Sequence, residues 1–185
     1  VIISPLMTAE KLTPMMRQYK DMKERYRDAI LFFRLGDFYE MFFEDAVMVS
    51  RLLNLTLTKR HTAPMCGIPF HALDSYLGRL TKLGKKVAIC EQLSDPNLPG
   101  IVERDVIRVV TPGTTFDERI LDQKSNRFII SVAFVGEKVK DRTIGLAICD
   151  LTTGLFQVSV PKNLEELSDE IFRLKPAECV IDAAE

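Results

Sequence analysis

The chain has 185 residues, of which 46% are hydrophobic and 28% are charged, and its formal net charge is −1. These values are typical of a folded globular protein and exclude a wholly disordered chain. No apolar run reaches about 18 residues, so a membrane-spanning helix is not expected. The first five residues form no convincing signal peptide, and because Val1 stands where an initiator Met would, we expect the chain to be part of something larger.

The first part of the chain predicts alternating helices and strands. Thr13 and Pro14 form a helix start, because Thr caps a helix N-terminus and Pro suits the first helical position. Residues 29–35 are a short apolar run that predicts a buried strand, ended by a turn at Gly36 and Asp37. Residues 38–43 could continue as a strand or begin a helix, since six residues do not settle the period. The other elements expected are a helix from Glu44, a strand at 55–58, a loop at 61–69, a helix at 70–83, and strands at 87–93 and 102–110.

The second part of the chain has a different pattern. A polar stretch at 117–127 predicts a linker between a domain at 1–116 and a second domain at 128–185. The second domain shows strands at 128–135, 143–151 and 155–160, a helix at 163–175 and a strand at 178–181. This βββαβ order is the first half of a ribonuclease-H-like fold, so we expect a truncated half-domain. The predicted class is mixed α/β, with an N-terminal mixed-sheet domain flanked by helices.

Basic side chains gather in one stretch of this nearly neutral chain. Residues 51–90 hold seven Lys or Arg residues and a single acid, Asp74. Such a patch favours a polyanion bound at one face. A solvated helix face together with basic loop ends is the alternative.

The cysteines and the missing motifs argue against a zinc site and against most enzymes. Cysteines at 66, 90, 149 and 179 lack the close spacing of zinc ligands, and they predict buried, reduced thiols in a cytosolic protein. No phosphate-binding loop, nucleophile elbow or HExxH motif occurs. A metal-dependent nuclease needs several carboxylates, and Glu137, Asp141 and Asp150 form no persuasive set. We expect Asp150 to be a strand-end residue at a turn, and we assign no catalytic residue.

The segment from Gly36 to Glu40 places two aromatic residues directly after a predicted turn. Phe38 and Tyr39 could be ordinary core aromatics. Alternatively, a turn-borne aromatic on a DNA-binding protein can insert between base steps and kink the duplex. If the segment is extended, Tyr39 points away from Phe38 and Glu40, and we expect it to lie in the core.

Six motifs, in the right order, resemble the N-terminus of the MutS DNA mismatch repair proteins. They lie at 13–19, 33–42, 55–60, 64–72, 87–92 and 108–114. Strand order and residues 150–154 extend the resemblance over 128–181. Cys66 stands where a small residue such as Ala is expected.

The resemblance implies that Phe38 stacks at a mispaired base and that Glu40 hydrogen-bonds that base. Glu40 could accept a hydrogen bond from a base donor, or it could be protonated and donate to a purine acceptor. The sequence leaves both open. Candidates for contacts to the DNA backbone or beside the wedge are Lys59, Arg60, Met65, His71 and Arg108.

The resemblance also implies a function, namely recognition of mispaired and unpaired bases at the start of mismatch repair. The family's ATPase lies outside this chain, so we expect no enzyme activity and no cofactor here, and ATP and Mg only in the full-length parent. Expected partners are mismatched double-stranded DNA, a second copy of the full-length parent, and a MutL-type factor through the connector. The expected location is the bacterial cytoplasm, at the nucleoid.

Two other functions stay open. One is a metal-dependent nuclease built on the second domain. The other is a branch of the family that acts on recombination or other DNA structures. Such branches often lack the Phe-x-Glu pair, so Phe38 and Glu40 favour mismatch repair.

Overall fold

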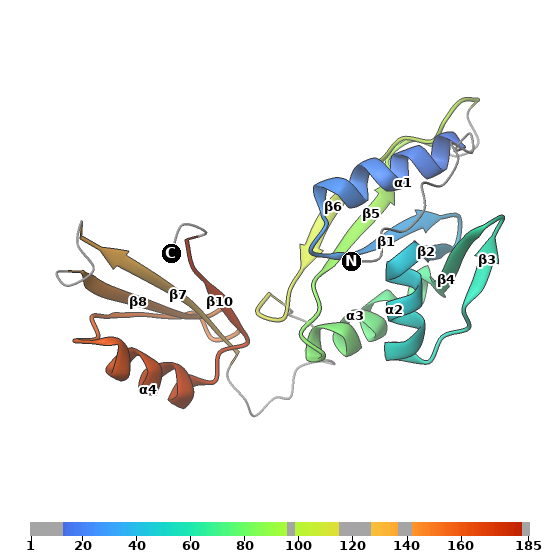
Figure 1. Cartoon of the computed structure of the whole chain (residues 1–185). Coiled ribbons are helices and arrows are strands. Elements are labelled where there is room, and N and C mark those ends of the chain that lie inside the picture. The colour runs from blue at the N-terminus through green and yellow to red at the C-terminus, as the bar shows by residue number, and fades with distance from the viewer. Residues whose placement is uncertain (1–12, 96–98, 115–126, 137–141, 183–185) are drawn as a thin grey trace, which may run out of the picture. The chain divides into compact units, whose positions relative to one another are not determined.

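The computed structural model describes residues 13–95, 99–114, 127–136 and 142–182 (Figure 1). These residues form four α-helices, a short 3₁₀ helix and ten strands in two mixed sheets, which confirms the expected mixed α/β class. The chain divides into two compact units, 1–73 with 86–109 and 74–85 with 110–185. The predicted linker lies outside the described residues except for Arg127, and the predicted domain boundaries stay a prediction.

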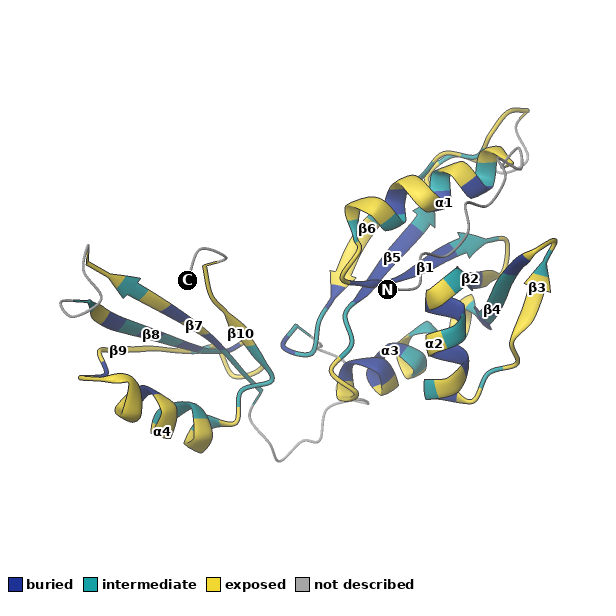
Figure 2. Ribbon diagram, in the orientation of Figure 1, coloured by how far each residue is buried: buried dark blue, intermediate teal, exposed yellow. Residues whose placement is uncertain are grey.

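A six-stranded sheet forms the first unit, in the order β3–β4–β2–β1–β5–β6. The strands are β1 (Ile30–Leu35), β2 (Phe38–Phe42), β3 (Thr58–Arg60), β4 (Ala63–Pro69), β5 (Val87–Gln92) and β6 (Arg104–Val110). β1 pairs with β2 antiparallel and with β5 parallel, so the sheet is mixed. Figure 2 shows β1 and β5 buried over most of their length, whereas the edge strand β3 is mostly exposed and the edge strand β6 consists mainly of intermediate and exposed residues.

Helix α1 (Pro14–Arg25) covers one face of this sheet. The predicted start is confirmed, because the Met16 N–H donates to the Thr13 hydroxyl at 3.3 Å. Tyr19 is buried against the sheet, and its ring meets Phe33 and Phe42 edge to face. The same tyrosine donates its hydroxyl proton to the Phe42 carbonyl at 3.2 Å, which fixes the end of β2 beneath the helix.

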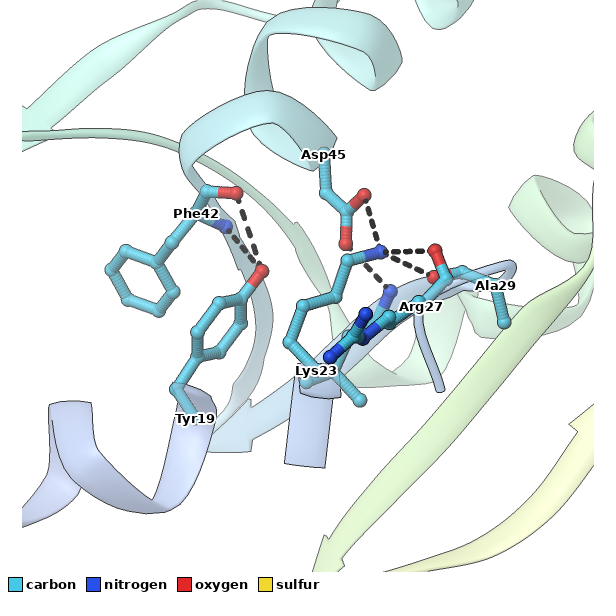
Figure 3. Close-up of polar contacts among 7 residues, drawn as sticks. Tyr19, Lys23, Arg27, Ala29, Phe42 and Asp45 are labelled. Carbon is cyan, nitrogen blue, oxygen red and sulfur yellow. Dashed lines mark hydrogen bonds and ion pairs between the residues drawn. The ribbon is translucent and has the colours of Figure 1, made fainter. Parts of the chain in front are cut away.

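Helix α2 (Phe43–Leu53) follows β2 directly and is anchored by a buried carboxylate. Asp45 accepts a hydrogen bond from the Leu31 N–H at 3.0 Å, and its other oxygen lies 3.0 Å from the Lys23 ammonium (Figure 3). Lys23 also donates to the Ala29 carbonyl at 2.6 Å. One carboxylate therefore joins α1, β1 and α2.

The sequence prediction was wrong for residues 55–72. The expected loop at 61–69 is mostly strand β4, which pairs with both β3 and β2. Its prolines, Pro64 and Pro69, lie near the two ends of the strand, where a missing N–H is best tolerated. The expected strand at 55–58 begins only at Thr58, and the expected helix at 70–83 is split into a 3₁₀ turn (Phe70–Ala72) and α3 (Leu73–Lys82).

The second unit contains α3 and a four-stranded sheet in the order β10–β7–β8–β9. Its elements are β7 (Phe128–Val135), β8 (Thr143–Asp150), β9 (Leu155–Ser159), α4 (Leu164–Leu174) and β10 (Glu178–Val180). Leu167 of α4 packs with Ile130, Val132 and Leu146, and β10 pairs with β7 parallel. The predicted βββαβ order is confirmed.

Two smaller findings concern thiols and membranes. Cys66 and Cys90 are buried as expected, but Cys149 is only partly buried, and Cys179, on the edge strand β10, is exposed. Within the described ranges, no helix is long and apolar enough to cross a membrane.

We predict that Asp45→Ala lowers the free energy of unfolding by about 3 kcal/mol. The change leaves the Leu31 N–H without its acceptor and the Lys23 ammonium without its counter-ion. Urea unfolding followed by circular dichroism measures the loss, and hydrogen exchange should accelerate at the Leu31 amide. The exposed neighbour gives a control, Glu44→Ala, which should change stability by less than about 0.5 kcal/mol. Unchanged protection of Leu31 in Asp45→Ala would contradict this role.

Candidate nucleic-acid interface

The turn between β1 and β2 carries an exposed aromatic ring. Leu35 pairs with Phe38, so the turn consists of Gly36 and Asp37, as the sequence predicted. Gly36 has a φ of +56°, a left-handed conformation that suits glycine in a two-residue hairpin turn. Phe38 is 48% exposed, whereas the next four residues of β2 are buried. One exposed apolar residue needs no special explanation by itself, so its neighbours decide what it can do.

The open alternative for residues 38–43 is settled, because 38–42 form a strand. Side chains alternate along a strand, so Phe38 and Glu40 share one face and Tyr39 lies on the other. Tyr39 is 3% exposed, which confirms that it belongs to the core. The residues predicted to meet a base therefore stand side by side on one face of the sheet.

Glu40 is a nearly buried acid with one charged partner. Its Oε1 lies 3.0 Å from Nη2 of Arg60, which reaches it from β3. Its Oε2 is buried and has no hydrogen-bond partner in the part of the chain that the structure describes. Burial raises the pKa of the Glu40 carboxyl, and the attraction of Arg60 offsets this only in part.

A glycine faces Glu40 across the sheet. Gly67 of β4 is the register partner of Glu40. A Cβ atom at this position would lie 3.6 Å from Cγ of Glu40 and 3.9 Å from Cδ1 of Phe38. Glycine therefore leaves space beside both side chains.

On the opposite face of the hairpin, Arg34 packs against two aromatic rings. Its guanidinium lies 4.2 Å from the ring centroid of Phe70 and 5.4 Å from that of Tyr39. The Tyr39 hydroxyl donates to Glu91, and burial together with this acid raises the pKa of Tyr39 to about 12. The Phe70 N–H donates to the Asp37 carbonyl at 2.9 Å. These contacts join the hairpin to the 3₁₀ turn that follows β4 and to β5.

Arg60 is the predicted basic residue that the structure brings to Glu40. It pairs with Ala63 across the hairpin of β3 and β4, and its side chain is 39% exposed. Lys59 is also exposed, but alternation turns its side chain to the other face. Met65 shares the face of Glu40 and pairs with Phe42, so it lies two residue pairs away from Glu40 and four from Phe38.

His71 and Arg108 are not brought to this group. His71 is exposed on the 3₁₀ turn, where its ring packs edge to face on Phe70, 5.8 Å away. Arg108 is exposed on β6, four residues beyond Arg104. Arg104 donates to the Arg34 carbonyl at 3.0 Å, so Arg108 lies about 13 Å farther along the strand from this end of the sheet.

Sequence reasoning missed two partly buried cations, Arg34 of the hairpin and Arg104 of β6. Arg34 interrupts an apolar run, and Arg104 lies over the Phe33 ring and donates to Gln18 at 3.1 Å. A charged residue inside a predicted buried strand is the signal that could have found Arg34, because a buried charge requires partners. Glu91 and Phe70 lie far along the chain, and no local pattern connects them with it.

Asp150, the residue of the nuclease hypothesis, is the last residue of β8 and is fully buried. It accepts hydrogen bonds from the N–H and the hydroxyl of Thr152, at 2.9 Å and 2.6 Å. It is therefore a strand-end residue at a turn, as predicted. Glu137 and Asp141 lie outside the described residues.

Comparison with known proteins identifies relatives of both units. The family model for MutS domain I matches residues 13–119, and the model for MutS domain II matches residues 127–185. The DNA mismatch repair protein MutS of Treponema denticola is 51% identical over 177 residues, which are 91% of this chain and 20% of that protein. Those of Desulforamulus reducens and Acetivibrio thermocellus are each 50% identical, over 92% of this chain and 20% of their own length. The chain thus spans about a fifth of the length of these curated relatives.

We predict that Glu40→Gln gains stability relative to the wild type as pH rises. A carboxyl whose pKa is raised by folding stabilises the folded state below its unfolded pKa, and this contribution is lost as pH rises through the folded pKa. Gln resembles the neutral acid and does not titrate. In thermal melts, the melting temperature of the variant relative to that of the wild type should be higher at pH 8 than at pH 4. Glu44→Gln, on the exposed start of α2, is the control and should show no such trend. If the variant and the wild type differ in melting temperature by the same amount at both pH values, the pKa of Glu40 is not raised by folding.

Proposed function

The chain belongs to the MutS family of DNA mismatch repair proteins, and we propose that it recognises mispaired and unpaired bases in duplex DNA. One observation carries the proposal. An exposed Phe38 and the nearly buried carboxyl of Glu40 lie on the same face of a hairpin that is held in place by contacts on its other face. In this proposal Phe38 stacks at the lesion and Glu40 hydrogen-bonds the mispaired base.

Deformability of the DNA supplies the discrimination. Wedging a side chain between base pairs costs a few kcal/mol per step in a matched duplex, because a good stack is lost. A mispair or an unpaired base is already poorly stacked, so the same ring enters at lower cost. Few base-edge contacts are needed, and one site can therefore accept many different mispairs.

Glu40 adds to this preference through its charge. A carboxylate is repelled by the phosphates of any duplex, and on matched DNA no base donor compensates for this. At a lesion the carboxyl gains a hydrogen bond to the displaced base. Its raised pKa favours the form in which the acid donates to a purine acceptor, although acceptance from a base donor uses the same geometry.

Affinity without sequence preference comes from the basic side chains. Arg60 lies on the face of Phe38 and Glu40, and we assign it a phosphate contact in the complex with a lesion. Lys59, His71 and Arg108 are exposed and can contact phosphates only where the DNA extends beyond this group, with Met65 as an apolar neighbour near Glu40. Each phosphate contact adds about 0.9 to the dependence of log K on log salt concentration.

The remaining assignments concern the whole protein. We propose that the first unit reads the lesion and that the sheet of β7 to β10 belongs to a connector that relays its state to a MutL-type factor. In this account the chain itself has no catalytic residue, and ATP, Mg and the homodimer belong to the full-length parent in the bacterial cytoplasm. The buried turn role of Asp150 gives no support to a nuclease.

We predict that Phe38→Ala in the full-length parent abolishes the preference for mispaired DNA. Stacking of a base on an aromatic ring contributes about 1–3 kcal/mol, so affinity for a lesion should fall by roughly tenfold or more. Affinity for the matched duplex, and its salt dependence, should change little. Fluorescence anisotropy on matched, G·T and one-base-loop duplexes at two salt concentrations measures all three quantities.

The second unit offers a matched control for this experiment. Phe156 is a phenylalanine on β9 that is 67% exposed, and Phe156→Ala should leave the preference intact. If Phe38→Ala retains the full preference of the wild type, Phe38 is not the wedge and the proposed mechanism fails.

A further inference from the structure

The carboxyl that should meet a base is already occupied in the free protein. Oε2 of Glu40 is buried, so an approaching base edge can reach the group only through Oε1. That oxygen is held by Nη2 of Arg60 at 3.0 Å. A base and Arg60 therefore compete for one atom.

Arg60 itself is accessible enough to bind a second anion. Its side chain is 39% exposed, compared with 11% for that of Glu40, so solvent and ligands reach the guanidinium more easily than the acid. A guanidinium has five N–H donors in a planar fork that matches the oxygens of a phosphate. Arg60 can thus leave Glu40 for a phosphate of the same duplex.

The two exchanges depend on each other. If Arg60 leaves while no base replaces it, Glu40 remains as an unpaired charge that is nearly buried, which is unfavourable. A matched duplex keeps its bases stacked and offers no replacement. A mispaired base that Phe38 displaces from the stack can replace Arg60 at Glu40.

We infer that Arg60 is a specificity-determining residue that stays on Glu40 when the duplex is matched and moves to a phosphate only when a mispaired base takes its place. The inference rests on the proposed function, because it requires a base at Glu40. It adds a second source of discrimination, since one phosphate contact is made on mispaired DNA alone.

The salt dependence of binding tests this exchange in the full-length parent. In Arg60→Gln, the slope of log K against log salt concentration should fall by about 0.9 for a G·T duplex and stay unchanged for the matched duplex. Lys59→Gln is the matched control, because its side chain lies on the other face of the same strand. It should affect the slopes for the two duplexes equally.

A second variant removes the competitor instead of the arginine. In Glu40→Gln, Arg60 loses its ion pair and becomes available to a phosphate on any duplex. The slope for matched DNA should then rise by about 0.9, and the double variant with Arg60→Gln should cancel this rise. This arm keeps the inference testable if Arg60→Gln alone fails to fold.

The outcomes separate the inference from the proposed function. If the wild type shows no preference for G·T over matched DNA, the proposed function fails. If the preference is present but Arg60→Gln lowers both slopes equally, Arg60 is a permanent phosphate contact and the exchange is refuted. If Arg60→Gln has the same salt slope as the wild type for both duplexes, the exchange is also refuted, because Arg60 then contacts no phosphate.

Discussion

The pairing of Leu35 with Phe38 across a two-residue turn determines the chemistry of the proposed site. Side chains alternate along β2, so this register places Phe38 and Glu40 on one face and buries Tyr39 on the other. A slip of one residue would bury the phenylalanine and present the tyrosine. Gly67 lies on β4, which pairs with β2, and Arg60 lies on β3, which pairs with β4. The contacts of Glu40 therefore depend on the same register.

Contacts at both ends of the hairpin hold it in place, and this positions Phe38 to insert between bases. At the end of β2, Tyr19 of α1 holds the Phe42 carbonyl. At the turn, Arg34 and Phe70 pack on the opposite face and the Phe70 N–H holds the Asp37 carbonyl. A ring that is already positioned loses little conformational freedom on binding, so more of its stacking energy can appear as preference for a lesion.

The sequence predicted the parts of this site that are local in the chain. The turn at Gly36, the core position of Tyr39 and the cap at Thr13 follow from patterns a few residues long. The ion pair of Glu40 with Arg60 spans twenty residues and depends on β4, which the prolines had suggested was a loop. The contacts of Arg34 depend on strand pairing and on Phe70, and no periodicity encodes them.

Fluorine NMR of Phe38 would test the central claim most directly, because it observes the ring itself. In the full-length parent, 4-fluorophenylalanine would be placed at position 38, and at the exposed Phe156 as a reference. The account predicts that the resonance at 38 shifts on a G·T or one-base-loop duplex and stays near its free position on the matched duplex at equal saturation. The reference should not distinguish the duplexes. The same shift on matched and mispaired DNA, or no shift on either, would contradict the claim that Phe38 stacks at the lesion.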